Sequence, residues 1–513
     1  MQEFLSRHSD RVMGVISGFD RIVFRGHLSN LMFSAAMEIF LNRVGVLRKD
    51  FGAYARGCTD ELKSASLAKV EELGRPYRYL TSSRHRKEDI VRRIQADSPV
   101  DEGLICVLSC VEPCMTYNLH RSREEKRLIF QLRPGKCQHL YHYFQHPRFG
   151  IMHVRLQTWF PFTVQICMNG REWLAKDLTK AGIDFAKHDN CFPFIEDIPR
   201  AQRLLSKQVR LDWPRVLDRL VLQVNPALPS IVQIKRPEHY WCAHQIEWAT
   251  DVMFGDPADI ARIYKPLVRH AMTHFSSGDV MRFLGRKVHG AFEGEIVSDF
   301  KNRPEGIRIK HSVGRNSVKA YDKAGSILRV ETTVNDPNML RAIRPKASTG
   351  ELALQPIRKT VADLERSTEV SQRANERYLD ALAELDQEKP LHDVLDPVCK
   401  HTTFRGRRVR ALKPWDRDDI NLLVAINNGD FILRGFRNGD IVDGLYSRRA
   451  VDDKEKRRRR SRVSRLLRIL RAHGMIRKLP KQNRYQVSTK GRQIVTAVLA
   501  VRDTPVAALL NAA

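Results

Sequence analysis

A 23-residue stretch near the C-terminus, KEKRRRRSRVSRLLRILRAHGMI (454–476), combines a dense run of basic residues with an apolar helical repeat. Val463, Leu466, Leu467 and Leu470 follow the i, i+3, i+4, i+7 spacing that aligns side chains on one face of an α-helix. A solvated charge run or a targeting tail has no reason to keep that spacing. The stretch therefore predicts a basic amphipathic helix that docks on other helices.

Charge is distributed unevenly along the 513 residues. The formal net charge is +29, and residues 401–513 alone hold 27 Lys or Arg against 10 Asp or Glu. Such a surplus predicts a polyanionic partner, with nucleic acid first and an anionic membrane surface second. Hydrophobic residues make up 42% of the chain, which is enough for packed cores and argues against disorder.

Two features suggest the compartment. No stretch approaches 18 consecutive apolar residues, and the start, MQEFLSRHSDRVMG, lacks the apolar segment of a secretory signal. The nine cysteines have no regular spacing, which is typical of buried thiols in a reducing compartment. We therefore expect a soluble protein without a membrane partner, cytoplasmic and nucleoid-associated.

Residues 401–513 predict a separate basic domain. Two amphipathic helices (414–426 and 435–446) precede the basic helix, and a basic strand–turn–strand (477–487) and a last helix (488–501) follow it. The segments RVSRLLRILRAHGMIRKL and NRYQVSTKGRQIV resemble the MarR-type winged helix-turn-helix family. The resemblance implies a winged-helix DNA-binding domain with a recognition helix followed by a wing.

Arginines on this helix and wing would neutralise phosphates while the apolar stripe docks on neighbouring helices. Those at 457–460 are expected to contact the backbone of the nucleic acid more than its bases. The predicted nucleic-acid-binding residues of this domain are Arg457, Arg458, Arg459, Arg460, Arg462, Arg465, Arg468 and Arg484.

Residues 346–400 predict a helical connector. Apolar and small polar residues recur at alternating steps of four and three between Ile357 and Leu385, with a polar middle. This spacing fits a helix that packs against the body, and it also fits the seam of a homodimer. We prefer packing against the body, because the polar middle argues against a strong coiled coil.

Residues 1–345 mix strand-like and helix-like segments, which predicts an α/β or α+β body over 1–260 and a hairpin-containing subdomain over 261–345. In GFDRIVFRGHL (18–28), Asp20 enters a short β-type run. A carboxylate at a strand edge is a frequent metal ligand in nucleases, although an ordinary Asp–Arg surface pair is the preferred interpretation of the pattern.

The stretch 151–175 alternates like a β-hairpin whose polar face carries Arg155, Gln157 and Trp159. Arginine binds phosphate, glutamine reads base edges and tryptophan stacks on bases. This face therefore predicts a second nucleic-acid-binding surface, and a purely structural hairpin with its polar side in solvent is the alternative.

The stretch 307–337 predicts a hairpin around the turn DKAGS, with Lys319 and Tyr321 on one face and Arg329 and Glu331 paired on the return strand. A tyrosine hydroxyl can attack a phosphodiester, Lys or Arg can stabilise the phosphorane, and a carboxylate can hold a divalent metal. The alternative is a structural hairpin with a cross-strand ion pair.

The pattern Tyr-Asp-Lys, turn, Arg-x-Glu at 316–333 is similar to one in rolling-circle replication initiators and relaxases of the Rep_trans kind. The resemblance implies Tyr321 as nucleophile, Lys319 and Lys323 as phosphate partners, and Glu331 as a metal ligand. The paired-histidine metal motif of many such nickases is missing from this sequence, so the likeness extends no further.

Further acidic ligands come from HQIEWATD (244–251), interpreted as a helix that sets His244, Glu247 and Asp251 on one face. Helix capping or surface pairing could produce the same spacing. The predicted metal ligands are thus Asp20, Glu247, Asp251 and Glu331, and Mg²⁺ or Mn²⁺ is the expected ion.

Cys110, Cys114 and Cys137, with His139 or His142, come close to zinc-site spacing. LICVLSCVEP also has the pattern of a buried strand, where Cys acts as a small hydrophobe. We prefer the buried strand and do not expect zinc.

The combined hypothesis is a DNA-binding protein of a mobile-element or replication type, with metal-dependent strand nicking or transfer centred on Tyr321 and assisted by Lys319, Lys323 and Arg329. One alternative is a non-catalytic winged-helix transcriptional regulator whose body senses a ligand or dimerises. The other is an RNA-binding protein.

Overall fold

The computed structural model describes residues 1–503 except 125, 235–237, 276, 286–295, 304–305, 346–348, 384–389, 428–435, 447–449 and 480–482. The chain divides into two compact units. The sheet unit comprises residues 9–264 and 299–375, and the terminal unit comprises residues 1–8, 265–298 and 376–513. No described helix is both long and apolar enough to cross a bilayer.

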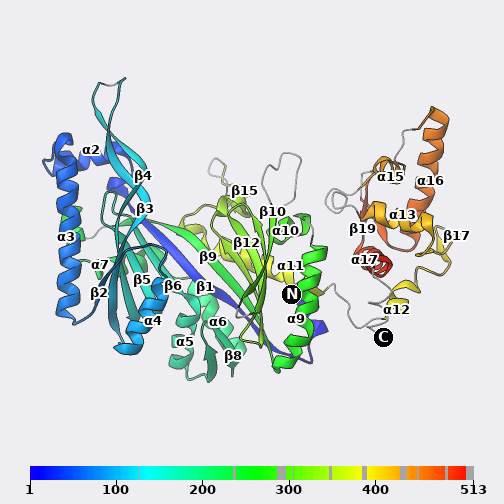
Figure 1. Ribbon diagram of the computed structural model, residues 1–513, viewed down its shortest axis with the longest axis horizontal. Helices are drawn as coiled ribbons and strands as arrows, with labels where there is room; N and C mark the ends of the chain where they lie inside the picture. The colour runs from blue at the N-terminus through cyan, green and yellow to red at the C-terminus, as the bar shows by residue number, and fades with distance from the viewer. Residues whose placement is uncertain are drawn as a thin grey trace. The chain divides into compact units, whose positions relative to one another are not determined.

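Within the described residues, eleven strands form one mixed sheet in the order β10-β11-β12-β13-β9-β1-β6-β5-β4-β3-β2 (Figure 1). The mixed α/β architecture expected for the body is present, and strands from both 1–260 and 261–345 belong to this sheet. The strands are β1 Val12–Leu28, β2 Tyr77–Leu80, β3 Gly103–Arg121, β4 Leu128–His146, β5 Gly150–Gln157, β6 Val164–Asn169, β9 His239–Phe254, β10 Ile296–Arg303, β11 Gly306–Val313, β12 Asn316–Lys323 and β13 Ile327–Val334.

The long central strands β1 and β9 pair antiparallel from Val12–Phe254 to Leu28–His239. The prediction of a helix over 244–251 is wrong, because these residues lie inside β9. The odd-numbered residues 245–251 alternate with β-branched or aromatic residues (Ile246, Trp248 and Thr250), and this period of two outweighs the helical spacing. Since Glu247 and Asp251 are an even number of residues apart, they still share a face.

Helices α5 (Gly170–Ala181) and α6 (Ile198–Val209) pack on the β1–β9 part of the sheet around Ile16, Leu174 and Leu205. Two glycines of β1 permit the close approach. A Cβ on Gly14 would lie 2.2 Å from a side-chain carbon of Ile198, and one on Gly18 would lie 2.6 Å from Leu205. The glycines thus fix how near α6 lies to the sheet.

Helix α11 (Leu364–Ala383) covers the other face, where Trp248, Thr250 and Thr332 point. Asn375 donates to the carbonyl of Trp248 at 3.0 Å and to Thr250 Oγ1 at 3.2 Å, and it accepts from Thr332 Oγ1 at 2.7 Å. Asn375 of the polar middle is therefore satisfied by the sheet, whereas Thr368 and Ser371 bond to carbonyls of their own helix. This contact supports the preferred alternative, packing against the body.

The C-terminal part of the terminal unit follows the predicted order of elements: α13 Arg417–Ile426, α15 Asn438–Leu445, α16 Asp453–Ala472, the hairpin β18 Ile476–Lys478 and β19 Tyr485–Val487, and α17 Thr489–Asp503. The predicted stripe of α16 is confirmed as a buried face, because Val463, Leu466, Leu467 and Leu470 all belong to one apolar core. Asp452 caps the helix by accepting from the backbone N–H of Glu455, and Gly474 ends it at φ 71°.

The other described elements have these bounds: α1 Gln2–Arg7, α2 Ser34–Arg43, α3 Phe51–Glu72, α4 Lys87–Asp97, β7 Phe185–His188, β8 Cys191–Ile195, α7 Trp213–Leu222, α8 Leu228–Ile231, α9 Pro257–His274, α10 Ser277–Phe283, β14 Arg341–Pro345, β15 Leu352–Pro356, α12 Leu391–Leu395, β16 Thr402–Phe404 and β17 Arg407–Val409.

Candidate active site on the sheet

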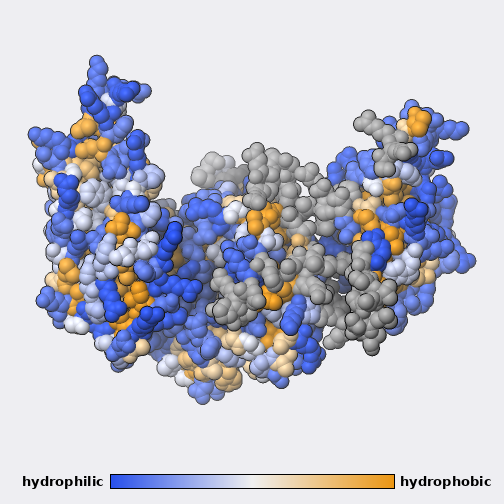
Figure 2. Space-filling view, in the orientation of Figure 1, coloured by the Kyte–Doolittle hydropathy of each residue, from blue (hydrophilic) through white to orange (hydrophobic). Residues whose placement is uncertain are grey.

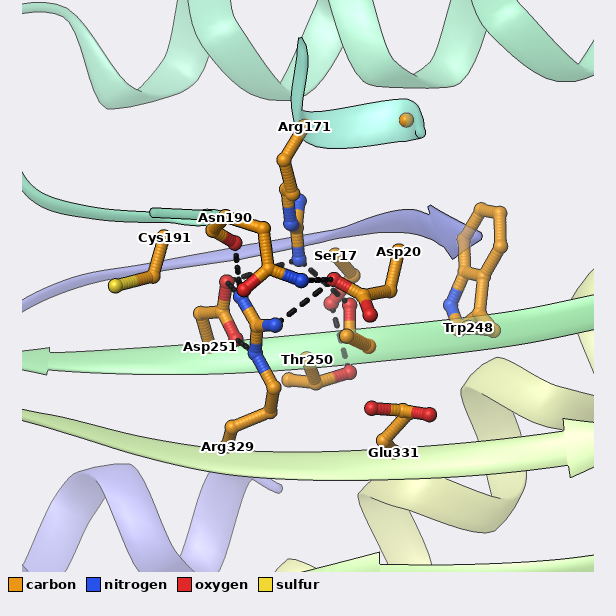
Figure 3. Close-up of polar contacts among 12 residues, drawn as sticks. Ser17, Asp20, Arg171, Asn190, Cys191, Trp248, Thr250, Asp251, Arg329 and Glu331 are labelled. Atoms are coloured by element: carbon orange, nitrogen blue, oxygen red, sulfur yellow. Dashed lines mark hydrogen bonds and ion pairs between the residues drawn. The ribbon is translucent and has the colours of Figure 1, made fainter. Parts of the chain in front are cut away.

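Cross-strand register brings the predicted residues of β12, β13 and β9 onto one face. Tyr321 pairs with Arg329, which pairs with Asp251, and Lys319 pairs with Glu331 two residues along the strands. Directly opposed residues of antiparallel strands point to the same side. The hairpin and its facing predicted for 316–333 are confirmed, and Figure 3 shows the arrangement around Arg329.

Asp20 joins this face through an irregularity in β1. Phe19 pairs with Trp248, but the next pair is Arg21 with Glu247, so one extra residue is accommodated at Asp20. Such a bulge breaks the strict alternation of a strand and lets consecutive side chains turn to one side. Both Asp20 and Arg21 therefore reach the face that carries Glu247.

Three of the four predicted acidic ligands form what we call the carboxylate cluster: Asp20, Glu247 and Glu331. One carboxylate oxygen from each lies within 4.8 Å of those of the other two. The residues are 7%, 8% and 0% exposed, so water can reach only the edge of the cluster. Three oxygens at this spacing can share one divalent ion such as Mg²⁺ or Mn²⁺.

The fourth predicted ligand, Asp251, is held by two arginines instead. Arg329 Nε and Nη2 donate to Asp251 at 2.6 and 2.9 Å, and Arg171 Nη2 of α5 lies 2.9 Å from Asp251 Oδ2. Burial alone would raise the pKa of Asp251, but Arg171 and Arg329 outweigh it and hold that pKa below its usual value. Asp251 is thus a permanent anion that anchors Arg329.

Arg329 also binds the carboxylate cluster, through Asp20. Its Nη1 donates to Asp20 Oδ1 at 2.8 Å, and Asn190 Nδ2 donates to the same oxygen at 2.7 Å (Figure 3). Burial nevertheless raises the pKa of Asp20, although Arg329 opposes the shift. A divalent cation beside Asp20 would reverse that shift by favouring the carboxylate. Arg329 is itself completely buried, so it positions carboxylates and does not face the clefts.

Glu331 lies between Tyr321 and Lys319. The Tyr321 hydroxyl donates to Glu331 Oε2 at 2.9 Å, and Lys319 Nζ lies 2.7 Å from Oε1 in an ion pair that lacks hydrogen-bond geometry. Burial, followed by the charge of Glu331, raises the pKa of Tyr321 well above its usual value. The phenol is therefore protonated near neutral pH, with a carboxylate in place to accept its proton.

Charges within the carboxylate cluster and its direct partners balance. The four anions Asp20, Glu247, Asp251 and Glu331 are matched by the four cations Arg21, Arg171, Lys319 and Arg329. Arg171 and Arg329 are fully buried, whereas the side chains of Lys319 and Arg21 are 17% and 46% exposed. Of these four cations, only Lys319 and Arg21 can therefore turn toward a ligand in solvent.

Two clefts meet at the cluster, and both are lined by Glu247 and Lys319. One, of about 380 Å³, is also lined by Asp20, Arg21 and His153. The other, of about 210 Å³, has a strongly basic and polar wall that includes Arg308, Lys310, Arg315, Ser317 and Asn335. Tyr321 is not among the described lining residues of either cleft.

Several residues of this site escaped the sequence analysis. Arg21, Arg171 and Gln245, whose Nε2 donates to Glu247 Oε1 at 2.7 Å, lie in stretches singled out for other residues, and Asn190 lies outside all of those stretches. Only Arg21 has a local signal, the Asp–Arg dipeptide at 20–21, and that dipeptide favours an ordinary surface pair. Arg21 pairs instead with Glu247, at 2.6 Å.

Other predicted residues have different partners. Lys323 pairs with Asp189 at 2.8 Å. Arg155 pairs with Glu112 at 2.9 Å, and Gln157 is 3% exposed with its amide donated to main-chain carbonyls. Trp159 follows the end of β5 and donates to the carbonyl of Tyr117, so it does not continue the polar row of the strand.

The basic residues of α16 are largely on the surface, which is predominantly hydrophilic over this helix in Figure 2. Arg457, Arg458, Arg460 and Arg465 are exposed. Arg459 pairs with Glu455 and Arg462 with Asp418, each at 2.6 Å. Arg468 and Arg484 are partly exposed.

A scan against protein-family models gives no match, and searches of the curated proteins and of the solved structures also give none.

Proposed function

We propose that the protein cleaves a phosphodiester bond of DNA with the help of a divalent cation held by Asp20, Glu247 and Glu331. The observation that carries the proposal is the approach of these three carboxylates to within 4.8 Å, beside two clefts that Asp20 and Glu247 line. Mg²⁺ or Mn²⁺ would bind a non-bridging phosphate oxygen and offset charge in the transition state.

The cations at the rim suit a phosphate ligand. Lys319 and Arg21 neutralise the cluster in the free protein, and an ion that replaces them leaves both free to contact phosphate oxygens. Arg308, Lys310 and Arg315 line the second cleft and extend positive charge away from the cluster. A nucleic-acid strand that crosses the cluster would meet these side chains with its backbone.

Tyr321 is the proposed nucleophile. Its proton passes to Glu331 Oε2 as the bond between its oxygen and phosphorus forms. The bond from phosphorus to the leaving deoxyribose oxygen breaks, and that oxygen takes up a proton from water. A covalent phosphotyrosine results, which is the intermediate of strand nicking or transfer.

Hydrolysis by a metal-bound water is the second candidate, and one observation favours it. Asp20, Glu247 and Lys319 line the clefts, whereas Tyr321 does not. In this version Tyr321 only orients Glu331, and no covalent adduct forms.

The terminal unit is proposed to bind DNA as a winged-helix domain. The support is the order of α13, α15, α16, hairpin and α17 around one core, together with the exposed arginines of α16. In the winged-helix geometry such a helix contacts the groove and the phosphates beside it. A regulator without catalysis and an RNA-binding protein remain the competing functions.

The test is nicking of supercoiled plasmid in Mg²⁺ or Mn²⁺ by the full chain. Glu247→Gln and Glu331→Gln should slow nicking by roughly 10²–10⁴-fold, and Glu71→Gln, an exposed carboxylate of α3, is the matched control. Tyr321→Phe should abolish nicking and a covalent protein–DNA adduct together. Nicking by Tyr321→Phe at the wild-type rate selects the hydrolytic version.

Absence of nicking by the wild-type chain in either metal contradicts the proposed function. A sharp footprint at one DNA site would then favour the regulator. Stronger binding of structured RNA than of duplex DNA would favour the RNA-binding protein.

A further inference from the structure

A second group of metal-ligating side chains lies on β3 and β4, apart from the carboxylate cluster. Cys114, Cys137 and His139 offer ligand atoms within 4.8 Å of one another, and the two Sγ atoms are 3.4 Å apart. Other candidates from the same segments have different partners: Cys110 donates to Glu112 at 3.1 Å, and His142 bonds to Ser66 at 3.0 Å.

The distances fit a tetrahedral thiolate site. Two sulfurs bound to one zinc ion at about 2.3 Å lie about 3.8 Å apart in a tetrahedron, so the observed 3.4 Å requires only a small separation of the thiols. His139 Nδ1 lies 3.2 Å from the carbonyl oxygen of Cys137. When Nδ1 donates this bond, Nε2 keeps its lone pair for a metal.

We propose that Cys114, Cys137 and His139 bind one zinc ion, with water as the fourth ligand. Two thiolates and an imidazole select zinc over the hard cations expected at the carboxylate cluster. Both cysteines are partly exposed, so an ion can reach them from solvent. The inference stands independently of the proposed DNA cleavage.

The site lies where a two-stranded ribbon leaves the sheet. The pairing of β4 with β5 ends at His139–Gln157, whereas β3 and β4 remain paired as far as Arg121–Leu128. Figure 1 shows this hairpin rising beyond the neighbouring strands. Zinc would join Cys114 of one ribbon strand to Cys137 and His139 of the other and fix the ribbon at its base.

The experiment measures zinc in the full chain, purified under reducing conditions and then supplied with ZnCl₂ and desalted. Wild type should retain about one zinc per chain, as should Cys399→Ser, which removes an exposed cysteine. Cys114→Ser and Cys137→Ser should lose it. Two thiols of the wild type should also become at least tenfold less reactive toward a thiol reagent in zinc.

A measurement on the wild type guards against variants that fail to fold. Co²⁺ in place of zinc should give a thiolate-to-metal charge-transfer band and tetrahedral d–d bands. No retained zinc and no such spectrum overturns the proposal. Zinc retained by folded Cys114→Ser also overturns it, as does a Cys114–Cys137 disulfide that persists under reducing conditions and excludes the metal.

Discussion

The carboxylate face of the sheet unit and helix α16 of the terminal unit handle charge in opposite ways. At the centre of the face, four carboxylates and four cations pair with one another, and two of those cations are completely buried. On α16, ten Lys or Arg accompany only two acidic residues, and most of the basic side chains face solvent. Charge surplus therefore indicates where a polyanion can dock, whereas groups suited to chemistry gather where charge is balanced and buried.

The largest predicted effect comes from removing a buried cation of the carboxylate face. Arg329→Met leaves Asp251 and Asp20 without their central partner inside the sheet. We expect a loss of about 3–5 kcal/mol in unfolding free energy, since removing one member of a buried pair strands the other. Urea denaturation of the sheet unit within the full chain, followed by tryptophan fluorescence, measures it. An Arg329→Met protein as stable as wild type would mean that the network adds nothing to folding.

The next largest loss of stability is expected from a substitution on the buried apolar face of α16. Leu467→Ala removes a buried side chain from the terminal core and should cost about 2–5 kcal/mol there. Hydrogen exchange of α16 in the full chain should accelerate accordingly, while exchange in β1 and β9 stays unchanged. Arg465→Ala, on the exposed side of the same helix, is the control. Equal acceleration by both variants would contradict the docked helix.

Acid should destabilise the sheet unit through its buried histidines. Burial lowers the pKa of His142 to about 3, below the value of about 6.5 in an unfolded chain. The unfolded state then binds more protons between these values, so stability is complete above about pH 6.5 and falls as the pH drops toward 3. His142→Gln should reduce the loss by up to ~1.4 kcal/mol per pH unit. Unfolding curves at several pH values check this, and an unchanged pH slope would contradict it.

The excess positive charge of α16 is tested by the salt dependence of DNA binding. Replacing Arg457, Arg458 and Arg460 with Gln should reduce the salt dependence of DNA binding by about 0.9 in log–log slope for each phosphate that the variant no longer neutralises. Fluorescence anisotropy over a range of salt concentrations measures the slope. Glu247→Gln should leave it within error of wild type. A triple variant with the wild-type slope would remove α16 from the proposed interface.

The smallest predicted effect comes from breaking an exposed ion pair, the counterpart of the buried pairs of Arg329. Arg462→Met breaks the pair with Asp418, whose side chains are 51% and 63% exposed. We expect a loss below about 1 kcal/mol, because water screens such pairs. Measured by the same denaturation protocol, a loss comparable to that of Arg329→Met would erase the distinction between the two regions.

The features that could be predicted from the sequence are those that depend on residues close together in the chain. The stripe of α16 and the hairpin at 316–333 follow from residue spacing and a turn sequence, and both are present. The spacing in 244–251 predicts a helix with Glu247 and Asp251 on one face, but the segment is a strand. The two residues still share a face because they are an even number of positions apart in β9. That agreement was fortuitous.

Long-range register decides the rest. The bulge at Asp20, the arrival of Arg171 from α5 and the approach of Asn190 depend on pairing between segments that are far apart in sequence. The same holds for Cys114 and Cys137, which come together across a hairpin and not through a local motif. No spacing rule within one segment carries this information.

Calorimetric titration of Mn²⁺ into the full chain tests the central claim, that Asp20, Glu247 and Glu331 share a cation. We predict one carboxylate-dependent site in the wild type. Binding should weaken at least tenfold in Glu247→Gln and Glu331→Gln and stay unchanged in Cys114→Ser. A wild-type chain that binds no Mn²⁺, or glutamine variants that bind it as tightly as the wild type, would contradict the account.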